Sequence, residues 1–177
     1  MHRHRAARGV GCVLIVLLLV AAPGSATAAA TATSWRWPLD PRPRVVEAFR
    51  APAGPYGPGH RGVDLEGHVG QPVRAAGPGT VAFAGLVAGR GVVSVDHPGG
   101  RRTTYEPVDA VVDIGDQVAA GTRLGTLGAA PGHCLPGTCL HWGLRRGAVY
   151  LNPLALLGLV RVRLLPVWTD DAAWMRR

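Results

Sequence analysis

The sequence of 177 residues contains no lysine, and all nineteen of its basic residues are arginine. Domains that carry biotin or lipoate attach the cofactor to a lysine, so the sequence excludes that class of carrier protein. Alanine, glycine, proline, valine and leucine dominate, which is typical of GC-rich coding sequence, so part of the arginine excess reflects codon usage. Amphipathic helical periodicity is also missing before Asn152, and this leaves β-structure as the expected class for most of the chain.

Residues 1–30 have the pattern of a secretory leader. Arg3, Arg5 and Arg8 precede an apolar run over residues 9–22, and small residues at 26–30 suit cleavage. The alternative is a retained membrane anchor, for which the apolar run is short. We therefore predict a signal peptide and a secreted, extracellular protein, which contacts a membrane only through an uncleaved leader.

Removal of the leader takes away three arginines and no acidic residue, so the net charge of +8 falls to +5. A modest positive charge suits a protein that works among anionic polymers. Nucleic acid would also attract such a charge, but the sequence contains no recognisable nucleic-acid-binding module. We expect no nucleic-acid partner.

The rest of the chain divides into three predicted parts. Residues 31–50 form an extended arm and a first strand, residues 51–159 a β domain, and residues 160–177 a C-terminal tail. Between residues 73 and 127, short valine-rich segments alternate with Gly and Pro about every 8–12 residues, which predicts antiparallel sheets. Pro98-Gly99-Gly100 predicts a hairpin turn, because glycine adopts positive φ at little cost. The expected fold class is all-β and mainly antiparallel.

Three polar residues form a candidate metal site. His60 and Asp64 stand four residues apart after a segment rich in Pro and Gly, and His141 lies in an apolar run that predicts a strand. Imidazole and carboxylate are usual zinc ligands, and three protein ligands leave a fourth position open for water, as a catalytic zinc requires.

From His60 to about Leu157 the chain resembles the lysostaphin/LytM-type zinc peptidases, which cut peptide cross-bridges in bacterial cell walls. The matching segments, apart from His60-x-x-x-Asp64, are residues 70–75, 79–81, 93–97, 103–105, 112–118, 121–125 and 140–142. The resemblance implies a β-sheet core like that of barrel-sandwich hybrids, with a zinc groove. It also implies Zn²⁺ held by His60, Asp64 and His141, and metalloendopeptidase action on peptidoglycan peptides.

Two positions depart from the family pattern. The family has two histidines that bind no metal but assist the reaction, and here their positions hold Cys139 and Pro107. One interpretation is that Glu106 acts as the base and His133 supplies the lost imidazole. A second is a non-catalytic domain that binds the wall or activates another wall hydrolase. In a third, Cys139 is a fourth zinc ligand, which would make the site closed and structural.

The remaining candidate residues are two cysteines and a tyrosine. Cys134 and Cys139 are the two cysteines that remain after the leader, and in an oxidising compartment we expect them to form a disulfide rather than leave Cys139 for zinc. Tyr105 is assigned to the substrate groove, although a tyrosine on a strand often packs in the core. His97, just before the hairpin turn, is expected to be structural.

Overall fold

The computed structural model describes residues 35–54, 56–129, 134 and 137–160, which belong to one compact unit within residues 32–177. The predicted leader and nearly all of the predicted tail lie outside the described residues. The described chain forms eleven strands and one short 3₁₀ helix, which together confirm the predicted all-β class. In chain order they are β1 (Val45–Glu47), β2 (Gly62–Gly67), β3 (Pro72–Arg74), β4 (Gly79–Val87), β5 (Arg90–His97), β6 (Arg101–Glu106), β7 (Val108–Ala110), β8 (Gln117–Val118), β9 (Arg123–Leu127), β10 (Thr138–Arg146), β11 (Val149–Leu151) and η1 (Pro153–Leu157).

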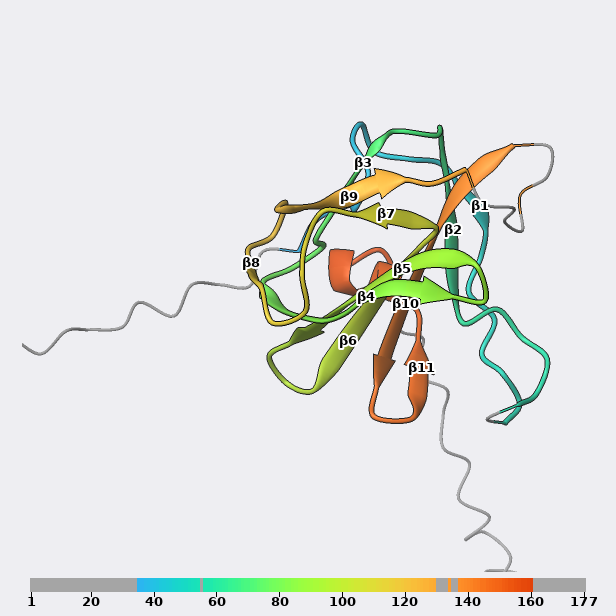
Figure 1. Cartoon of the computed structure of the whole chain (residues 1–177). Helices are drawn as coiled ribbons and strands as arrows, with labels where there is room; N and C mark the ends of the chain where they lie inside the picture. The colour runs from blue at the N-terminus through green and yellow to red at the C-terminus, as the bar shows by residue number, and fades with distance from the viewer. Residues whose placement is uncertain (1–34, 55, 130–133, 135–136, 161–177) are drawn as a thin grey trace, which may run out of the picture. The chain divides into compact units, whose positions relative to one another are not determined.

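The strands form two sheets in which every pair is antiparallel. The larger sheet has the order β1-β2-β10-β6-β5-β4-β8, with β11 paired to β10, and the smaller has the order β3-β9-β7. Figure 1 shows β3, β9 and β7 together in the upper part of the view. The topology places β2 and β10 side by side although seven strands separate them along the chain.

The predicted hairpin is confirmed between β5 and β6. The two strands pair in register from Val93–Tyr105 to His97–Arg101. Gly99 and Gly100 in the turn have φ of 79° and 70°, values that side chains with a Cβ rarely adopt. The glycines therefore allow β6 to return beside β5.

Alternation along β2, β6 and β10 sends one set of side chains into the core and the other to the opposite face. The inward set includes Leu65, Tyr105, Leu140 and Trp142, all buried in one apolar cluster. The cluster continues into the smaller sheet, so the core lies between the two sheets. The opposite face of β2 and β10 carries Asp64, Cys139 and His141.

The segment before β1 packs against the domain without forming a strand of its own. Leu39 is buried in the core. The backbone N–H of Arg36 donates to the carbonyl of Ala76, and that of Arg74 donates to the carbonyl of Pro38, both at 2.9 Å. The part of the chain that the structure describes contains no helix with the length and apolar character needed to cross a bilayer.

Candidate metal centre

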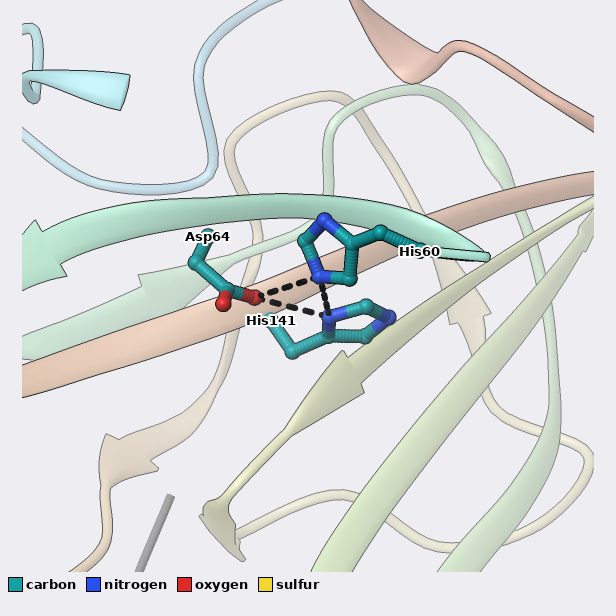
Figure 2. Close-up of side chains that lie close together, drawn as sticks. All are labelled: His60, Asp64 and His141. Carbon is teal, nitrogen blue, oxygen red and sulfur yellow. Dashed lines mark hydrogen bonds and ion pairs between the residues drawn. The ribbon is translucent and has the colours of Figure 1, made fainter. Parts of the chain in front are cut away.

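His60, Asp64 and His141 converge on one point, on the face of the larger sheet that points away from the core (Figure 2). Asp64 in β2 and His141 in β10 are direct partners across the two strands, and His60 lies just before β2. Asp64 Oδ1 is 3.1 Å from His60 Nε2 and 2.8 Å from His141 Nδ1. The two imidazole nitrogens are 3.1 Å apart. The structure thus brings the three predicted ligands together.

The surroundings of His60 set which of its nitrogens can bind a cation. Its Nδ1 lies 2.9 Å from the carbonyl oxygen of Ala48. A carbonyl can only accept, so in the neutral ring Nδ1 carries the hydrogen and Nε2 has the lone pair. This lone pair points toward Asp64 and His141. A backbone carbonyl in this role is a common support for a metal-binding histidine.

The donor set fits a zinc ion. One ligand atom from each of the three residues lies within 4.8 Å of the others. Asp64 is fully buried and His60 nearly so, and a buried carboxylate is costly unless a cation or hydrogen bonds compensate it. Two imidazole nitrogens and one carboxylate oxygen match the ligand types of zinc sites that keep a fourth position open.

Gly62 supports the position of His141. A Cβ at this residue would lie 2.4 Å from the carbonyl oxygen of Trp142 and 2.7 Å from His141 Nε2. The absence of a side chain therefore lets β10 and the imidazole approach β2 closely. Gly62 is not among the residues predicted from the sequence, although a glycine inside a strand is a known signal of close approach by another group.

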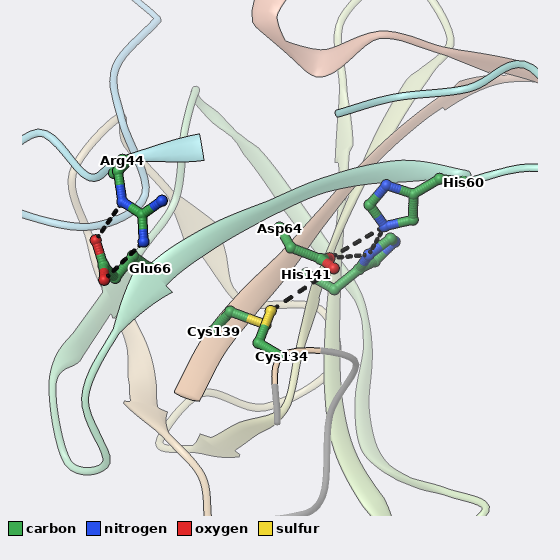
Figure 3. Close-up of a disulfide and its surroundings, with 7 residues drawn as sticks. All are labelled: Arg44, His60, Asp64, Glu66, Cys134, Cys139 and His141. Carbon is green, nitrogen blue, oxygen red and sulfur yellow. Dashed lines mark hydrogen bonds and ion pairs between the residues drawn. A yellow bond between two sulfur atoms is a disulfide. The ribbon is translucent and has the colours of Figure 1, made fainter. Parts of the chain in front are cut away.

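A disulfide between Cys134 and Cys139 lies beside the ligands (Figure 3). The sulfur atoms are 2.06 Å apart, and Cys134 Sγ is 3.9 Å from Asp64 Oδ2. Cys139 is two residues before His141 on β10, so both side chains point to the same face. Because the bond occupies both sulfurs, neither cysteine offers a thiolate ligand, and the interpretation of a closed site with Cys139 does not describe this form of the protein.

Glu106 lies next to His141 on the face that carries the ligands. The two residues are direct partners across β6 and β10, and such pairs place their side chains on the same side of a sheet. The Glu106 side chain is 22% exposed, and its Oε2 lies 3.7 Å from Arg90 Nε. That nitrogen is buried and has no hydrogen-bond partner among the described residues. Arg90 is thus a second residue near the site that was not predicted, and no local sequence pattern indicates its position.

The prediction that Tyr105 lines the substrate groove is wrong. The residue is fully buried in the core. Its hydroxyl accepts a hydrogen bond from the backbone N–H of Ala76 and shares another with Thr103 Oγ1, both at 2.9 Å. Burial raises the pKa of Tyr105 to about 12. Its neighbour Glu106 faces the groove, so the strand alternation directs Tyr105 to the opposite side.

Two further histidines were assigned roles from the sequence. His97 is buried, with Nδ1 2.8 Å from the Pro78 carbonyl oxygen and Nε2 2.7 Å from Thr103 Oγ1, which agrees with a structural role. Desolvation lowers the pKa of His97. His133 lies outside the described residues, so its assistance to the reaction stays a prediction.

Cavities adjoin the metal centre on two sides. One, of about 620 Å³, is lined by residues of β1, β2 and the disulfide, and includes the exposed ion pair of Arg44 and Glu66. The other, of about 370 Å³, is lined by residues of β6, β10 and β11, including Glu106. There the Arg61 guanidinium lies over the Tyr150 ring, 5.3 Å from its centroid. His60 borders both cavities, so an extended ligand that filled both would pass the three converging side chains.

Comparison with known proteins identifies relatives over most of the described chain. The family model "Peptidase family M23" matches residues 58–153. An uncharacterized protein of Mycobacterium tuberculosis is 52% identical over 137 residues, which are 75% of this chain and 55% of that protein. The chain therefore spans about half the length of these curated relatives.

Solved structures show the same fold. A putative peptidase M23 of Pseudomonas aeruginosa superposes with a TM-score of 0.55 at 25% identity, over 74% of this chain and 53% of that one. Lysostaphin of Staphylococcus simulans superposes with a TM-score of 0.55 at 23% identity, over 72% of this chain and 57% of that one. The second likeness is one of fold alone.

Proposed function

We propose a function from one premise: this chain belongs to peptidase family M23. The resemblance to the lysostaphin-type peptidases is thereby confirmed as a family relationship. On this premise we infer that the protein is a secreted, zinc-dependent endopeptidase that cuts the peptides of peptidoglycan. The observation that carries the proposal is the convergence of His60, Asp64 and His141 on a single point beside two cavities.

The three converging residues would hold the metal. A zinc ion bound there would supply Lewis-acid polarisation of a peptide carbonyl and would lower the pKa of water. The chain contributes the orientation: the Ala48 carbonyl fixes the tautomer of His60, and Gly62 lets the His141 ring sit against β2. Side chains held in this way lose little entropy when the reaction begins.

Glu106 is the residue best placed to handle the proton of the attacking water. It faces the same side as His141, on the neighbouring strand, and borders one of the two cavities. A carboxylate can take this role only while it is charged and correctly oriented. The buried Arg90 Nε, at 3.7 Å, restrains the direction of the carboxylate. Glu106 would thus replace the imidazole that the family has at the position of Pro107.

The substrate would lie across both cavities, with the scissile bond next to the metal. A peptide chain is extended, and the two cavities on either side of His60 can take the residues before and after the bond. Peptidoglycan peptides are the proposed substrate because of the family relationship, the predicted leader and the net positive charge of the chain without that leader.

A second function is favoured by one observation. The position of the family's first assisting histidine holds Cys139, whose sulfur is bonded to Cys134 and cannot transfer a proton. A domain without this group could bind zinc and wall peptides without cutting them, and could serve as an activator of another wall hydrolase. This candidate requires that Glu106 does not replace the lost imidazoles.

The first experiment measures soluble peptide released from purified peptidoglycan by the zinc-loaded protein, with His60→Ala as the control. Release that the control lacks would support the peptidase, and Glu106→Gln should then abolish release while the protein retains zinc. No release from a protein that holds one zinc per chain would contradict the peptidase and favour the non-catalytic candidate.

A further inference from the structure

The two cysteines of the disulfide, together with Asp64, form a second group of residues that could bind a metal ion. Asp64, Cys134 and Cys139 offer ligand atoms that lie within 4.8 Å of one another, and Asp64 is shared with the set that contains the two histidines. Figure 3 shows the two sulfurs next to the Asp64 carboxylate, on the side away from His60. In the oxidised form these sulfurs are bonded to each other and offer no thiolate.

We propose that the disulfide is a redox latch on the metal centre, and that its reduction gives the metal a fourth protein ligand, the thiolate of Cys139. The inference rests on the proposed zinc site, and it adds a form of regulation to that site. The oxidised protein keeps three protein ligands and an open position. The reduced protein has a closed set of two imidazoles, one carboxylate and one thiolate, which is the arrangement of structural zinc sites.

Cys139 is the better ligand of the two cysteines because a strand holds it. It is buried in β10, two residues before His141, and its backbone pairs with Glu66 of β2. Its side chain therefore already points to the face of the ligands. Cys134 precedes β10 and lies outside the strands, so no strand pairing holds its sulfur beside the ligands.

The redox step is a thiol–disulfide exchange with a dithiol, either a small molecule or a dithiol protein. The dithiol gives two electrons and two protons, the bond between Cys134 and Cys139 breaks, two thiols form, and the dithiol becomes a disulfide. Cys139 then loses its proton to water as its sulfur joins the ligand set, since a coordinated thiol is deprotonated. A soft thiolate binds zinc well, which favours the closed set once it is available.

The closed set is expected to block the reaction and to tighten metal binding. A fourth protein ligand takes the position that water needs, so a zinc-loaded protein should lose peptidase activity on reduction. The dissociation constant for zinc should fall by at least about tenfold. Loss of a residue that only supports a ligand already changes metal affinity by about 10–100-fold, and a direct ligand should have at least the smaller of these effects. Reoxidation should reverse both changes.

Cobalt(II) in place of zinc tests the inference without any substrate. A cobalt–thiolate bond produces a charge-transfer band in the near ultraviolet, whereas nitrogen and oxygen ligands do not. We expect the oxidised full chain to bind cobalt without this band and to gain it on treatment with a dithiol. Cys134→Ser, which leaves the Cys139 thiol in place, should show the band without any reductant.

Cys139→Ser is the matched control, and it should bind cobalt without the band in either redox state. Circular dichroism would verify that both serine variants are folded, and reduced wild-type protein gives the same answer if one of them is not. A band in Cys139→Ser would overturn the assignment to Cys139. If the reduced wild type binds cobalt without the band, the redox latch is refuted but the metal centre is not. Failure to bind cobalt in either state would overturn the metal centre and the proposed function with it.

Discussion

Strands β2, β6 and β10 have two faces with opposite chemistry. One face buries Leu65, Leu140 and Tyr105 in the core, and the other carries Asp64 and His141 toward the cavities. Neighbouring residues in one strand therefore serve different purposes: the first set stabilises the domain, and the second offers ligands. We therefore expect that substitutions in the metal centre leave the fold intact, because its side chains contribute little to the apolar core.

The largest effect is expected from a pair of neighbouring substitutions in β10. His141→Ala removes a ligand and should weaken zinc binding more than roughly 10–100-fold, which is the effect of mutating a residue that only supports a ligand. The free energy of unfolding of the metal-free protein should not change. Leu140→Ala should retain zinc binding but cost about 2–5 kcal/mol of unfolding free energy through lost packing. Zinc titration with a chromophoric chelator and urea unfolding of the metal-free proteins measure the two effects.

His68→Ala is the control for the first substitution, since His68 is exposed and lies in the loop after β2. Equal losses of stability in the His141 and Leu140 variants would contradict the division between the two faces.

Glu106→Gln extends the comparison to β6. The amide keeps the size of the side chain but cannot accept the proton, so the rate of peptide release should fall about 10²–10⁴-fold with zinc content unchanged. Asp96→Asn is the matched control, because Asp96 is an exposed carboxylate of β5 that pairs with Arg102 and lines neither cavity. Similar rates for the wild type and the Glu106 variant would remove this residue from the mechanism.

Tyr105→Phe examines the core face of the same strand. It removes the hydroxyl that accepts from the Ala76 N–H and leaves that buried donor without its partner. The expected loss is about 1–3 kcal/mol of unfolding free energy, with no change in zinc affinity or in the substrate concentration dependence of the rate. A selective rise in KM with unchanged stability would restore the tyrosine to the groove.

The smallest effect concerns pH. Desolvation lowers the pKa of His97 from 6.5, so the unfolded chain binds a proton at higher pH than the folded protein. His97 therefore contributes stability above about pH 6.5, and that contribution decreases as the pH falls below 6.5 toward the pKa of the folded protein. The stability of the metal-free wild type should fall more between pH 7.5 and 5 than that of His97→Gln. Urea unfolding at both values measures this, and parallel decreases would contradict it.

The predicted leader, His133 and most of the tail lie outside the described residues, so the structure does not bear on these predictions. Within the described residues, the predicted disulfide is confirmed and the predicted place of Tyr105 is wrong. The disulfide between Cys134 and Cys139 was expected from compartment and spacing, and the structure contains it. The assignment of Tyr105 to the groove failed because alternation shows which residues share a face but not which face is buried.

The fold class, the hairpin at Gly99 and Gly100, and the residue types of the metal centre could all be predicted from the amino-acid sequence. These features depend on local chemistry: glycine permits positive φ, valine-rich alternation forms strands, and imidazole and carboxylate bind zinc. Three contacts became visible only in the folded chain: Gly62 leaves room for the His141 ring, Arg90 lies near Glu106, and the disulfide lies beside Asp64. Each of these contacts joins residues from different segments, which strand pairing or the disulfide brings together, and no local pattern specifies this arrangement.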